Sequence, residues 1–530
     1  MTSVFRNGRI FVPSTQNGNE FADEMIIEND RISYVGSKAE IPDDATLVDL
    51  ENRVVIPGFI DAHVHILHYG HSLRKLNLIK CTSLQHIRET ISAYAKANPD
   101  VPRILCQGWI QSSTNGVALA SMLDDLDPRP IIIDSFDLHS MWCNSAALDE
   151  MKAHSAPDLP GGTIHRDGNG RASGLLDEGA LASLAWPYVD SVYSAEDKVA
   201  ALDTAVAAYT AAGYTGIVDM AMDEGTWQLL DQYRRDKPFP FHVAAHWLVP
   251  FSSDQAANFA HVDRAIEVKK QYTDPTFTIA GIKLICDGVV DGCTAALLQP
   301  YANKPDPVEP IWPTDMLTEA IQRADAAELQ CAIHAIGDKA INQAINALSE
   351  AGTPGRRHRI EHLELSTSED AKRLGELGIT ASIQPVHSDP ALSKAWPSLI
   401  GHDRCKRAFA YKEFLDGGAP LAIGTDAPTA PHFPFPNLYN ATTRRSAVEP
   451  ETTTTVNSHF GLSLAEAATA ATTGAAYSRF ADSWTGALKA GLSADFLVVD
   501  MQWSPEKFLQ ANVVQTWYRG KKAYDRNVKI

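Results

Sequence analysis

Residues 54–65 read VVIPGFIDAHVH. The apolar run Val54–Ile60 predicts a buried strand, and two histidines, His63 and His65, follow its carboxyl end. Side chains alternate along a strand, so His63 and His65 point to one side and Val64 to the other. Two imidazoles that converge on one point suit a zinc-type divalent ion. A His-x-His pair alone is weak evidence, so the rest of the chain must support this interpretation.

Helix and strand patterns alternate regularly after about residue 195, which favours a parallel sheet. Eight strands are predicted in total, at 54–60, 215–220, 241–249, 277–286, 330–336, 358–363, 379–386 and 420–424, and the last predicted helix between them spans 404–417. Eight βα units close a barrel. An open doubly wound sheet would also alternate, but the glycine-rich phosphate loop that it should carry is absent. We therefore predict an α/β fold, a (β/α)8 TIM barrel.

The two ends of the chain both have the sequence pattern of short strands. Residues 4–11 alternate around Asn7-Gly8, a pair typical of a hairpin turn, and residues 495–500 and 513–520 return to the same style. We predict a small β-sandwich domain built from both termini, residues 1–56 and 481–530, around a barrel at 57–480. A stretch at about 70–195 breaks the helix–strand rhythm and is predicted to be an insertion after the first barrel strand. Two unrelated edge hairpins are the alternative for the termini.

The overall composition narrows the class of protein. The 530-residue chain has a formal net charge of −19, which argues against a nucleic-acid or anionic-membrane partner. The sequence shows no basic segment followed by an apolar core at its start, and no apolar run long enough to span a bilayer. Its seven cysteines are scattered without CxxC spacing, as in reduced thiols. We expect a cytoplasmic enzyme, and a homodimer is left open.

Two further histidines close neighbouring predicted strands, His334 and His362. Either alone would more often be an ordinary core or loop histidine. Four imidazoles on three strand ends can hold two metal ions, or one ion with a histidine that orients the substrate. Asp426 follows the eighth strand, where it could simply cap a helix. Opposite four histidines, we predict that Asp426 binds the metal weakly and is the general base that takes a proton from water.

A lysine lies inside the apolar predicted strand at 277–286, namely Lys283. A buried lysine is costly unless it is paired or chemically altered. Neutral lysine can react with carbon dioxide to form a carbamate, which would bridge two metals. A surface lysine on an edge strand is the alternative, but a closed barrel has no edge strands. The rival bridging group is Glu178, in the predicted insertion.

The motifs together resemble those of a known enzyme family. The run at 55–65 resembles the signature of the amidohydrolase superfamily, and the remainder resembles amidohydrolase family 3, which includes N-substituted formamide deformylases. The motifs that carry this resemblance are Lys283 with Asp287-Gly288, residues 334–338, 359–362, 384–385, 424–428 and 495–500. Thr425 stands where serine is commoner. The resemblance covers essentially the whole chain and is specific for the family but not for the substrate.

The resemblance implies a set of metal ligands and roles. One ion would be bound by His63 and His65 and a second by His334 and His362, with carboxylated Lys283 as the bridge and Asp426 as the base. The expected cofactor is one or two divalent ions, with zinc as the first candidate. The implied reaction is hydrolysis of a carbon–nitrogen bond in a small, non-peptide amide. With a single ion, His362 would polarise the carbonyl.

Substrate contacts are expected from four residues, Trp109, His139, Asp287 and Phe433. Trp109 and His139 lie in the insertion, which could cover the barrel mouth, and aromatic residues there or in the loop at 429–436 would favour a hydrophobic or aromatic substrate. Burial in an ordinary core is the alternative for each aromatic. Four other functions stay open: a deaminase or cyclic-amide hydrolase, a decarboxylase, an esterase, and a binding protein without activity.

Overall fold

The computed structural model describes residues 2–13, 21–38, 41–136, 138–157 and 162–528, except the side chains of residues 178 and 182. The chain divides into two compact units, Met1–Ile66 with Val206–Ile530, and Leu67–Ala205. The first unit contains the barrel and the sheets formed by the termini. The predicted insertion at about 70–195 falls within the second unit.

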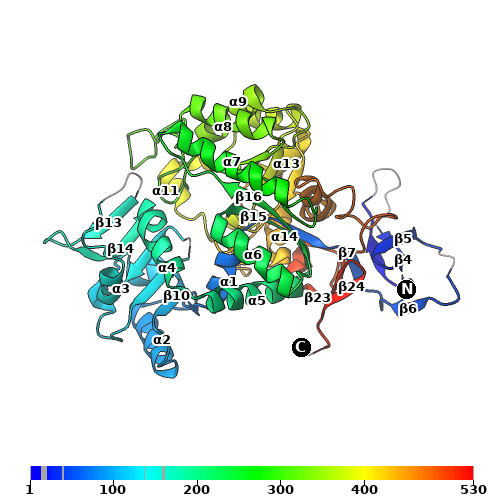
Figure 1. Ribbon diagram of the computed structural model, residues 1–530, viewed down its shortest axis with the longest axis horizontal. Helices are drawn as coiled ribbons and strands as arrows, with labels where there is room; N and C mark the ends of the chain where they lie inside the picture. Colours follow the sequence, from blue (N-terminus) through cyan, green and yellow to red (C-terminus); the bar gives the residue numbers. More distant parts are fainter. Residues whose placement is uncertain (1, 14–20, 39–40, 137, 158–161, 529–530) are drawn as a thin grey trace. The chain divides into compact units, whose positions relative to one another are not determined.

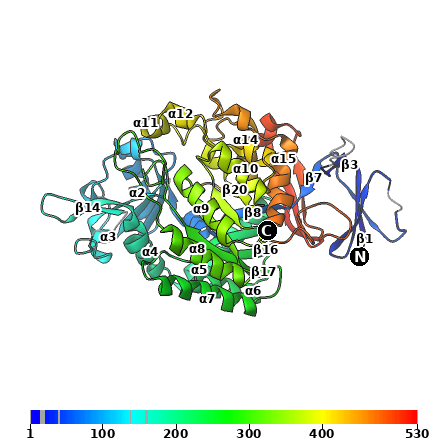
Figure 2. The ribbon, with the colours of Figure 1, turned by 90° about the horizontal axis from the view of Figure 1, so that it is seen from above.

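The barrel is a sheet of eight strands in the order β21-β20-β19-β18-β17-β16-β15-β8, each parallel to its neighbour. In chain order the strands are β8 (Phe59–Val64), β15 (Tyr214–Met222), β16 (His242–Leu248), β17 (Phe277–Ile285), β18 (Gln330–Ala335), β19 (Arg359–His362), β20 (Thr380–Ile383) and β21 (Leu421–Ile423). The predicted α/β barrel is therefore confirmed, and Figures 1 and 2 show its strands with the helices around them.

The first and last strands meet only near their carboxyl ends. The N–H of Asp426 donates to the His63 carbonyl (2.7 Å), and the N–H of His65 donates to the Ala427 carbonyl (3.0 Å). An added Cβ at Gly424 would lie 2.5 Å from the His63 nitrogen, so a glycine is needed for this close approach. The junction of the barrel therefore lies beside the first predicted metal ligands.

Helices cover the outside of the barrel, and small residues fill its interior. The helices are α5 (Ala195–Ala211), α6 (Glu224–Asp236), α7 (Gln255–Gln271), α8 (Thr314–Ala326), α9 (Asp338–Ala351), α10 (Ser368–Glu376), α13 (Tyr411–Asp416), α14 (Pro434–Thr443) and α15 (Leu464–Thr469). Asp223 and Asp254 cap α6 and α7 by accepting backbone N–H groups. Ala62, Val218 and Ala244 come from different strands and belong to one cluster of buried side chains. These side chains therefore share the middle of the barrel.

The predicted strand at 54–60 is two strands in two sheets. β7 (Val54–Pro57) pairs with β22 (Phe496–Asp500) and with β2 (Arg9–Phe11) in a terminal sheet, whereas β8 belongs to the barrel. Pro57 has no N–H, and the next N–H, from Gly58, donates to Asp495 in the terminal sheet. The chain changes sheets at the Pro57-Gly58 pair, which a continuous apolar pattern does not reveal.

The expected hairpin around Asn7-Gly8 is not formed. β1 (Thr2–Arg6) pairs with β4 (Glu24–Glu28) and β6 (Thr46–Asp49), whereas β2 pairs with β3 (Phe21–Ala22) and β7. The connection between β6 and β7 bonds to both arms of the turn, through Leu50 N–H to the Arg6 carbonyl and Arg9 N–H to the Arg53 carbonyl. This segment separates the two strands that a hairpin would join.

Two other predicted elements are shorter than expected. The helix at 404–417 is broken into α12 (His402–Cys405) and α13, with Phe409 between them at a φ of 60°. The strand at 379–386 ends with β20 at Ile383, because Pro385 starts a short 3-10 helix, η4 (Pro385–Ser388). That early end places His387 on a turn at the barrel mouth.

The termini form two sheets that share a hydrophobic cluster. One sheet has the order β5-β4-β1-β6 and the other β24-β23-β22-β7-β2-β3, with β5 at Arg31–Gly36, β23 at Asn512–Tyr518 and β24 at Lys521–Asp525. Phe5 from the first sheet packs against Phe496 and Trp517 from the second, with ring centroids 5.2 and 5.3 Å away. Segments from opposite ends of the chain therefore stabilise each other, as the blue and red strands near β7 and β24 in Figure 1 show.

The second unit contains a mixed sheet in the order β13-β14-β12-β11-β10-β9. Its strands are β9 (Leu76–Asn77), β10 (Ile104–Trp109), β11 (Ile131–Ser135), β12 (Ser140–Cys143), β13 (Gly162–Arg166) and β14 (Ala172–Glu178), and its helices include α1 (Ile66–Arg74), α2 (Leu84–Ala97), α3 (Ser145–Glu150) and α4 (Trp186–Val192). Two clusters of buried side chains stabilise this unit. Among the described residues, every helix is too short or too polar to cross a membrane.

Candidate metal centre at the barrel mouth

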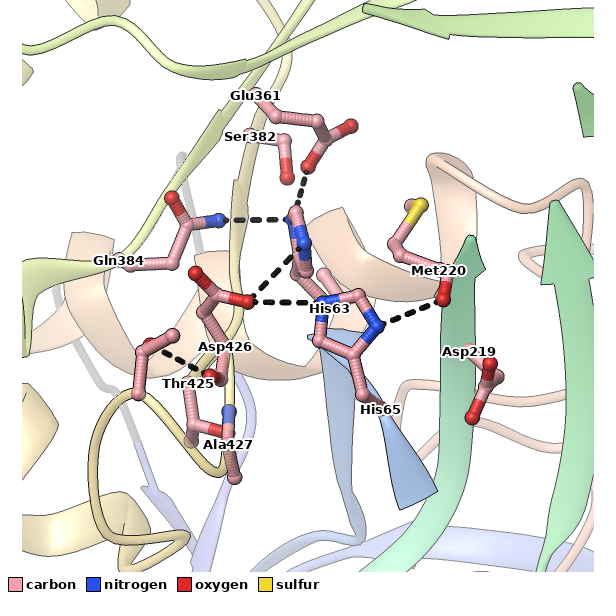
Figure 3. A network of polar contacts seen from close by, with 12 residues as sticks. His63, His65, Asp219, Met220, Glu361, Ser382, Gln384, Thr425, Asp426 and Ala427 are labelled. Carbon is pink, nitrogen blue, oxygen red and sulfur yellow. Dashed lines mark hydrogen bonds and ion pairs between the residues drawn. The ribbon is translucent and has the colours of Figure 1, made fainter. Parts of the chain in front are cut away.

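Two histidines and one aspartate converge at the junction of the first and last strands (Figure 3). The Nε2 atoms of His63 and His65 lie 3.3 and 3.2 Å from the same oxygen, Oδ1 of Asp426. The candidate ligand atoms of these three residues all lie within 4.8 Å of one another. The group combines imidazole nitrogens with a carboxylate oxygen, which is the donor set that zinc-type ions use in proteins.

The other ring nitrogen of each histidine is held by a hydrogen-bond partner. His65 Nδ1 lies 2.8 Å from the Met220 carbonyl, which can only accept, so this nitrogen carries the proton. His63 Nδ1 lies 2.8 Å from Oε2 of Glu361 and donates to that carboxylate. In the neutral rings, both Nε2 atoms then direct a lone pair towards Asp426. Such outer partners orient the ligands of metal sites.

A buried arginine fixes the carboxylate that orients His63. Arg359 donates from Nε to Oε1 (2.5 Å) and from Nη2 to Oε2 (3.1 Å) of Glu361. It also donates to the Ala62 carbonyl (2.6 Å) and to Ser382 (2.7 Å), and it is fully buried. Although burial alone would raise the pKa of Glu361, the charge of Arg359 and the bond to His63 hold it well below its usual value. Glu361 therefore stays ionised and keeps its orienting role.

The backbone at Asp426 is held in a left-handed conformation, with a φ of 57°. Asp61 anchors the preceding residue, since its carboxylate accepts the N–H of Thr425 (2.9 Å) and its hydroxyl (2.6 Å). The hydroxyl of Tyr209 donates to the same carboxylate (2.9 Å). Burial raises the pKa of Asp61 to about 6. The sequence motif contains Asp61, but sequence reasoning did not assign it this positioning role.

The electrostatics keep the rings of His63 and His334 in the neutral form, whereas those of His65 favour its protonated form. Burial, together with the charge of Lys283, lowers the pKa of His63 to about 4 and that of His334 to about 3, so both rings are neutral at pH 7. Burial also lowers the pKa of His65, but the hydrogen bond and charge of Asp426 outweigh it and the pKa is raised overall. A neutral imidazole is the form that binds a metal.

Lys283 lies in β17 with 3% of its surface exposed. Its Nζ has no hydrogen-bond partner among the described residues, and burial lowers its pKa to about 8. A fraction of the amine is therefore neutral near pH 7, which is the form that reacts with carbon dioxide. The side chain of the rival group, Glu178, lies outside the described side chains.

The other two predicted ligands lie beside the first group. The ring centroid of His362 is 5.1 Å from that of His63 and 4.4 Å from that of His334. His334 Nε2 donates to the Gly288 carbonyl (3.3 Å) and lies 3.6 Å from Oδ1 of Asp287. The structure therefore brings all four predicted histidines to one end of the barrel. Their roles as ligands remain predictions.

A second group of candidate ligands contains two residues that sequence reasoning did not single out. His362, Glu364 and His387 also have candidate ligand atoms within 4.8 Å of one another. Glu364 follows the Arg359–His362 motif by two residues, and His387 follows Gln384-Pro385. Their positions in the sequence, two residues after each of these motifs, were the signal from which they could have been identified.

The four predicted substrate-binding residues have different surroundings. Asp287 is buried and accepts the N–H groups of Ala296, Ile336 and Gly337 at 2.8–3.0 Å, which fixes two loops. Phe433 is 53% exposed and contacts the ring of His432, whose carbonyl accepts the hydroxyl of Tyr214 at the start of β15.

Trp109 and His139 belong to the second unit. Trp109 is 1% exposed and packs against Trp142 in a hydrophobic cluster, with ring centroids 5.4 Å apart. His139 is half-buried and lies between β11 and β12. A role in substrate binding stays a prediction for both residues, and the core position of Trp109 is the alternative stated for it above.

These features together define the class of the protein. In (β/α)8 barrel enzymes the active site lies at the carboxyl ends of the strands, where this chain gathers four histidines, a lysine and Asp426. The model of the amidohydrolase family matches residues 46–524, so the chain belongs to that family. The predicted family is thereby confirmed.

Relatives from bacteria and a plant match nearly the whole chain. Protein LONG AFTER FAR-RED 3 of Arabidopsis thaliana is 29% identical, with 98% of this chain and 91% of the relative covered. The putative amidohydrolase YtcJ of Bacillus subtilis (strain 168) is 28% identical, with 94% of each covered. N-substituted formamide deformylase of Arthrobacter pascens is 24% identical, with 96% of each covered.

Solved structures share the fold. An uncharacterized metal-dependent hydrolase from Pyrococcus horikoshii OT3 superposes with a TM-score of 0.76 at 22% identity, covering 96% of this chain and 98% of that one. Atrazine chlorohydrolase from Arthrobacter aurescens TC1, in a complex with zinc, gives 0.56 at 13% identity, covering 98% and 95%. At these identities the likeness establishes the fold alone.

Proposed function

We propose that this amidohydrolase uses a divalent metal ion, with zinc as the first candidate, to hydrolyse a non-peptide carbon–nitrogen bond of a small amide. One observation carries the proposal: Nε2 of His63 and Nε2 of His65 converge on Oδ1 of Asp426 while both Nδ1 atoms are already bonded. When both rings are neutral, this arrangement directs two lone pairs towards a carboxylate, and a cation between them would bind all three atoms.

The residues present fit a metal ion on three counts. The neutral state of His63 supplies a nitrogen lone pair, and Asp426 supplies negative charge, because its pKa stays well below the usual value despite its burial. The buried Nδ1 of His362 and Nζ of Lys283 have no hydrogen-bond partner in the described part of the chain. Buried polar atoms without partners are uncommon in native proteins and need an explanation. We propose that Lys283 is carboxylated and contributes an oxygen ligand.

The two carboxylate oxygens of Asp426 have separate roles in the proposed mechanism. A divalent ion bound at this position supplies a Lewis acid that polarises the substrate carbonyl and acidifies water. Asp426 accepts a proton from the attacking water and later donates it to the leaving amine. Its Oδ1 faces His63 and His65, whereas its Oδ2 lies 3.9 Å from His387 Nε2, so Oδ2 is the oxygen open to the proton. Glu361 and Arg359 hold His63 in place throughout.

The reaction class is supported by the relatives. The deformylase of Arthrobacter pascens bears a name that describes cleavage of N-substituted formamides, and it matches 96% of this chain. We propose an acyclic N-acyl or N-formyl amide as the substrate class. The terminal sheets, with their shared cluster, are proposed to form the small β-sandwich domain that accompanies the barrel.

The test combines metal removal with a substrate screen. The purified chain would be dialysed against a chelator, its metal content measured by elemental analysis, and amine release measured across a library of N-acyl and N-formyl amides. We expect activity to disappear with the metal and to return on addition of Zn²⁺. Full activity in the metal-free protein would refute metal dependence. Release of ammonia from a ring amine, without cleavage of any acyclic amide, would instead identify a deaminase.

A further inference from the structure

We propose that the substrate carries an apolar acyl chain, and that Leu248, Phe251 and Ile285, together the apolar wall, bind this chain at the barrel mouth. The inference rests on the proposed function and narrows its substrate class from any acyl or formyl amide to amides of longer, apolar carboxylic acids. The three residues lie on β16, in the segment directly after it, and on β17.

Ile285 lies beside the proposed metal centre. It follows Lys283 by two residues at the carboxyl end of β17, and side chains two apart on a strand lie on the same face. Lys283 faces inwards, because it pairs with Ala332, whose side chain belongs to the buried cluster inside the barrel. Ile285 itself pairs with His334 of β18. An apolar side chain, 37% exposed, therefore faces the mouth between two predicted metal ligands.

Leu248 continues the apolar surface on the neighbouring strand. It is the last residue of β16 and pairs with Lys283, so its side chain lies on the same inward face. It is half-buried, whereas Trp247 faces outwards and is 3% exposed. The pairing continues by one residue, since the N–H of Val249 donates to the Lys283 carbonyl (3.0 Å). Leu248 and Ile285 therefore both stand next to Lys283.

Phe251 extends this surface beyond the end of β16. Its ring packs edge-on against Trp312, with ring centroids 5.1 Å apart, and 38% of the residue is exposed. Trp312 is held beside the end of β17, because the N–H of the preceding residue, Ile311, donates to the Cys286 carbonyl (2.7 Å). Phe251 therefore lies close to the end of the strand that carries Ile285.

The surroundings of the apolar wall indicate a ligand. Single exposed apolar residues are common on protein surfaces and need no explanation. Three of them beside the predicted ligands of a metal centre form the combination that ligand sites use, because such sites are lined mainly by apolar side chains with a few polar groups that orient the ligand. The metal centre supplies the polar groups, and the apolar wall supplies the remainder.

The position of the wall assigns it to the acyl half of the amide. The proposed mechanism places the leaving amine beside Asp426, which follows β21 at the junction with β8. In the ring of eight strands, β17 lies three strands from β8 and four from β21, so it is across the mouth from Asp426. The acyl substituent leaves the carbonyl carbon on the side away from the amine. It therefore extends towards β17 and the apolar wall.

A formamide leaves the apolar wall uncovered. Its acyl side has only a hydrogen atom on the carbonyl carbon, which reaches none of the three side chains. Each CH₂ group that a longer chain removes from water should improve binding by about fourfold. An amide with an acyl chain of several carbons is therefore expected to be a better substrate than the corresponding formamide.

The test measures kcat/KM for anilides that all release the same amine. Metal-loaded protein would be assayed for aniline release from formanilide, acetanilide, butyranilide and hexananilide. From acetyl to hexanoyl the intrinsic reactivity of the carbonyl is similar, so a rise in kcat/KM reports binding of the chain. We expect a rise of about fourfold for each CH₂ group that the wall covers. Lengthening the amine half instead, as in 4-butylacetanilide, should change kcat/KM less.

Variants of the wall separate chain binding from the metal chemistry. Ile285→Ser and Phe251→Ser should each reduce the ratio of kcat/KM for hexananilide to that for formanilide by about tenfold. Ile285→Val, which stays apolar, should keep most of this ratio. Phe480→Ser is the matched control, because Phe480 is 40% exposed and lies beside Arg357, just before β19 at the opposite end of the barrel. Elemental analysis and circular dichroism would confirm that each variant binds metal and is folded.

The possible outcomes distinguish the two proposals. A kcat/KM that stays level or falls from acetyl to hexanoyl would overturn the apolar wall and leave the proposed amide hydrolysis intact, as would a length preference that both serine variants retain in full. A larger gain from the amine half would overturn the assignment to the acyl half. If the metal-loaded protein hydrolysed no anilide and no other acyclic amide, the proposed function would fail, and this inference would fail with it.

Discussion

The two ends of the barrel both bury histidines, but His242 at one end and the pair His63 and His65 at the other have partners of opposite charge. At the amino end, His242 opens β16, and its Nδ1 accepts a hydrogen bond from Arg479, which also donates to the Pro275 carbonyl (2.6 Å). At the carboxyl end, His63 and His65 share Oδ1 of Asp426. Burial and the charge of Arg479 hold the pKa of His242 well below its usual value.

The difference shows that the hydrogen-bond partner of a buried histidine determines whether its ring nitrogen can bind a cation. Arg479 donates a hydrogen bond to the lone pair of His242 Nδ1, and its positive charge repels cations. A carboxylate leaves the lone pairs of His63 and His65 open and attracts cations. A count of histidines cannot separate these cases, whereas the hydrogen-bond partner and the charge beside each ring nitrogen can.

The largest effect is expected from removing the charge at the mouth. Asp426→Asn keeps the shape of the side chain but cannot accept the water proton, so turnover should fall by about 100- to 10,000-fold. Metal content should change little, because the histidine nitrogens remain. Turnover would be measured on the best amide from the screen and metal by elemental analysis, with the exposed Asp403→Asn as the control. Unchanged turnover would show that another group is the base.

A smaller effect is expected from the group behind His63. Glu361→Gln keeps a hydrogen-bond acceptor for His63 Nδ1 but loses the charge, so metal affinity should fall by about 10- to 100-fold. Calorimetric titration with Zn²⁺ measures this change. His242→Asn, at the opposite end, should leave the affinity unchanged. An equal loss in both variants would contradict the distinction between the two ends.

The junction of the barrel provides a test of packing. In Gly424→Ala the new methyl group would lie 2.5 Å from the His63 nitrogen and 2.7 Å from its Cβ, so strands β8 and β21 must separate. Overpacking of this kind costs about 1–3 kcal/mol. Denaturant unfolding of the metal-free protein gives the stability, and Zn²⁺ titration should show weaker binding. Gly168→Ala is the control, because an added Cβ at Gly168 meets nothing within 4 Å and its φ is not in the left-handed region.

The mildest effect concerns the pH dependence of stability. His246 donates to Gln330 (2.8 Å) inside the barrel, and burial together with the charge of Arg359 lowers its pKa to about 3. Between pH 6.5 and about 3 the unfolded chain binds a proton at this histidine that the folded chain does not, so stability falls as pH decreases. One such group contributes a slope of about 1.4 kcal/mol per pH unit.

His246→Asn should therefore reduce that slope by about this amount in the metal-free protein. Denaturant unfolding at several pH values from 6 to 4 would measure it. The variant should lose stability at pH 7, where the packing is disturbed, while its dependence on pH becomes flatter. A slope identical to the wild type would mean that His246 is protonated in the folded protein.

Much of the barrel and of the first group of candidate ligands could be predicted from the sequence. The alternation of helix and strand patterns marked β15 to β21, the apolar run at 54–60 marked only the start of β8, and the predicted histidines stand at strand ends in short motifs. Such signals are local, because each depends on a few consecutive residues. Asp426 was also identifiable, since it follows the eighth strand in a short motif.

The features that could not be predicted depend on contacts between distant segments. The Asn7-Gly8 pair is a local hairpin signal, but the segment around Leu50 separates its strands, and the change of sheet at Pro57 depends on a partner near Asp495. The second group of candidate ligands was missed for the same reason. Glu364 and His387 meet because two strands end early and His362 takes a left-handed conformation, neither of which has a periodic pattern.

The hydrogen bond from the Asp426 N–H to the His63 carbonyl joins residues from opposite ends of the barrel sequence. During synthesis, a nascent chain that has emerged only as far as β20 carries His63 and His65 but not yet Asp426, the proposed base. Under the proposed function, a truncation before residue 426 would therefore show no turnover, because it lacks both the base and the contact between β8 and the segment after β21, however well its other strands fold.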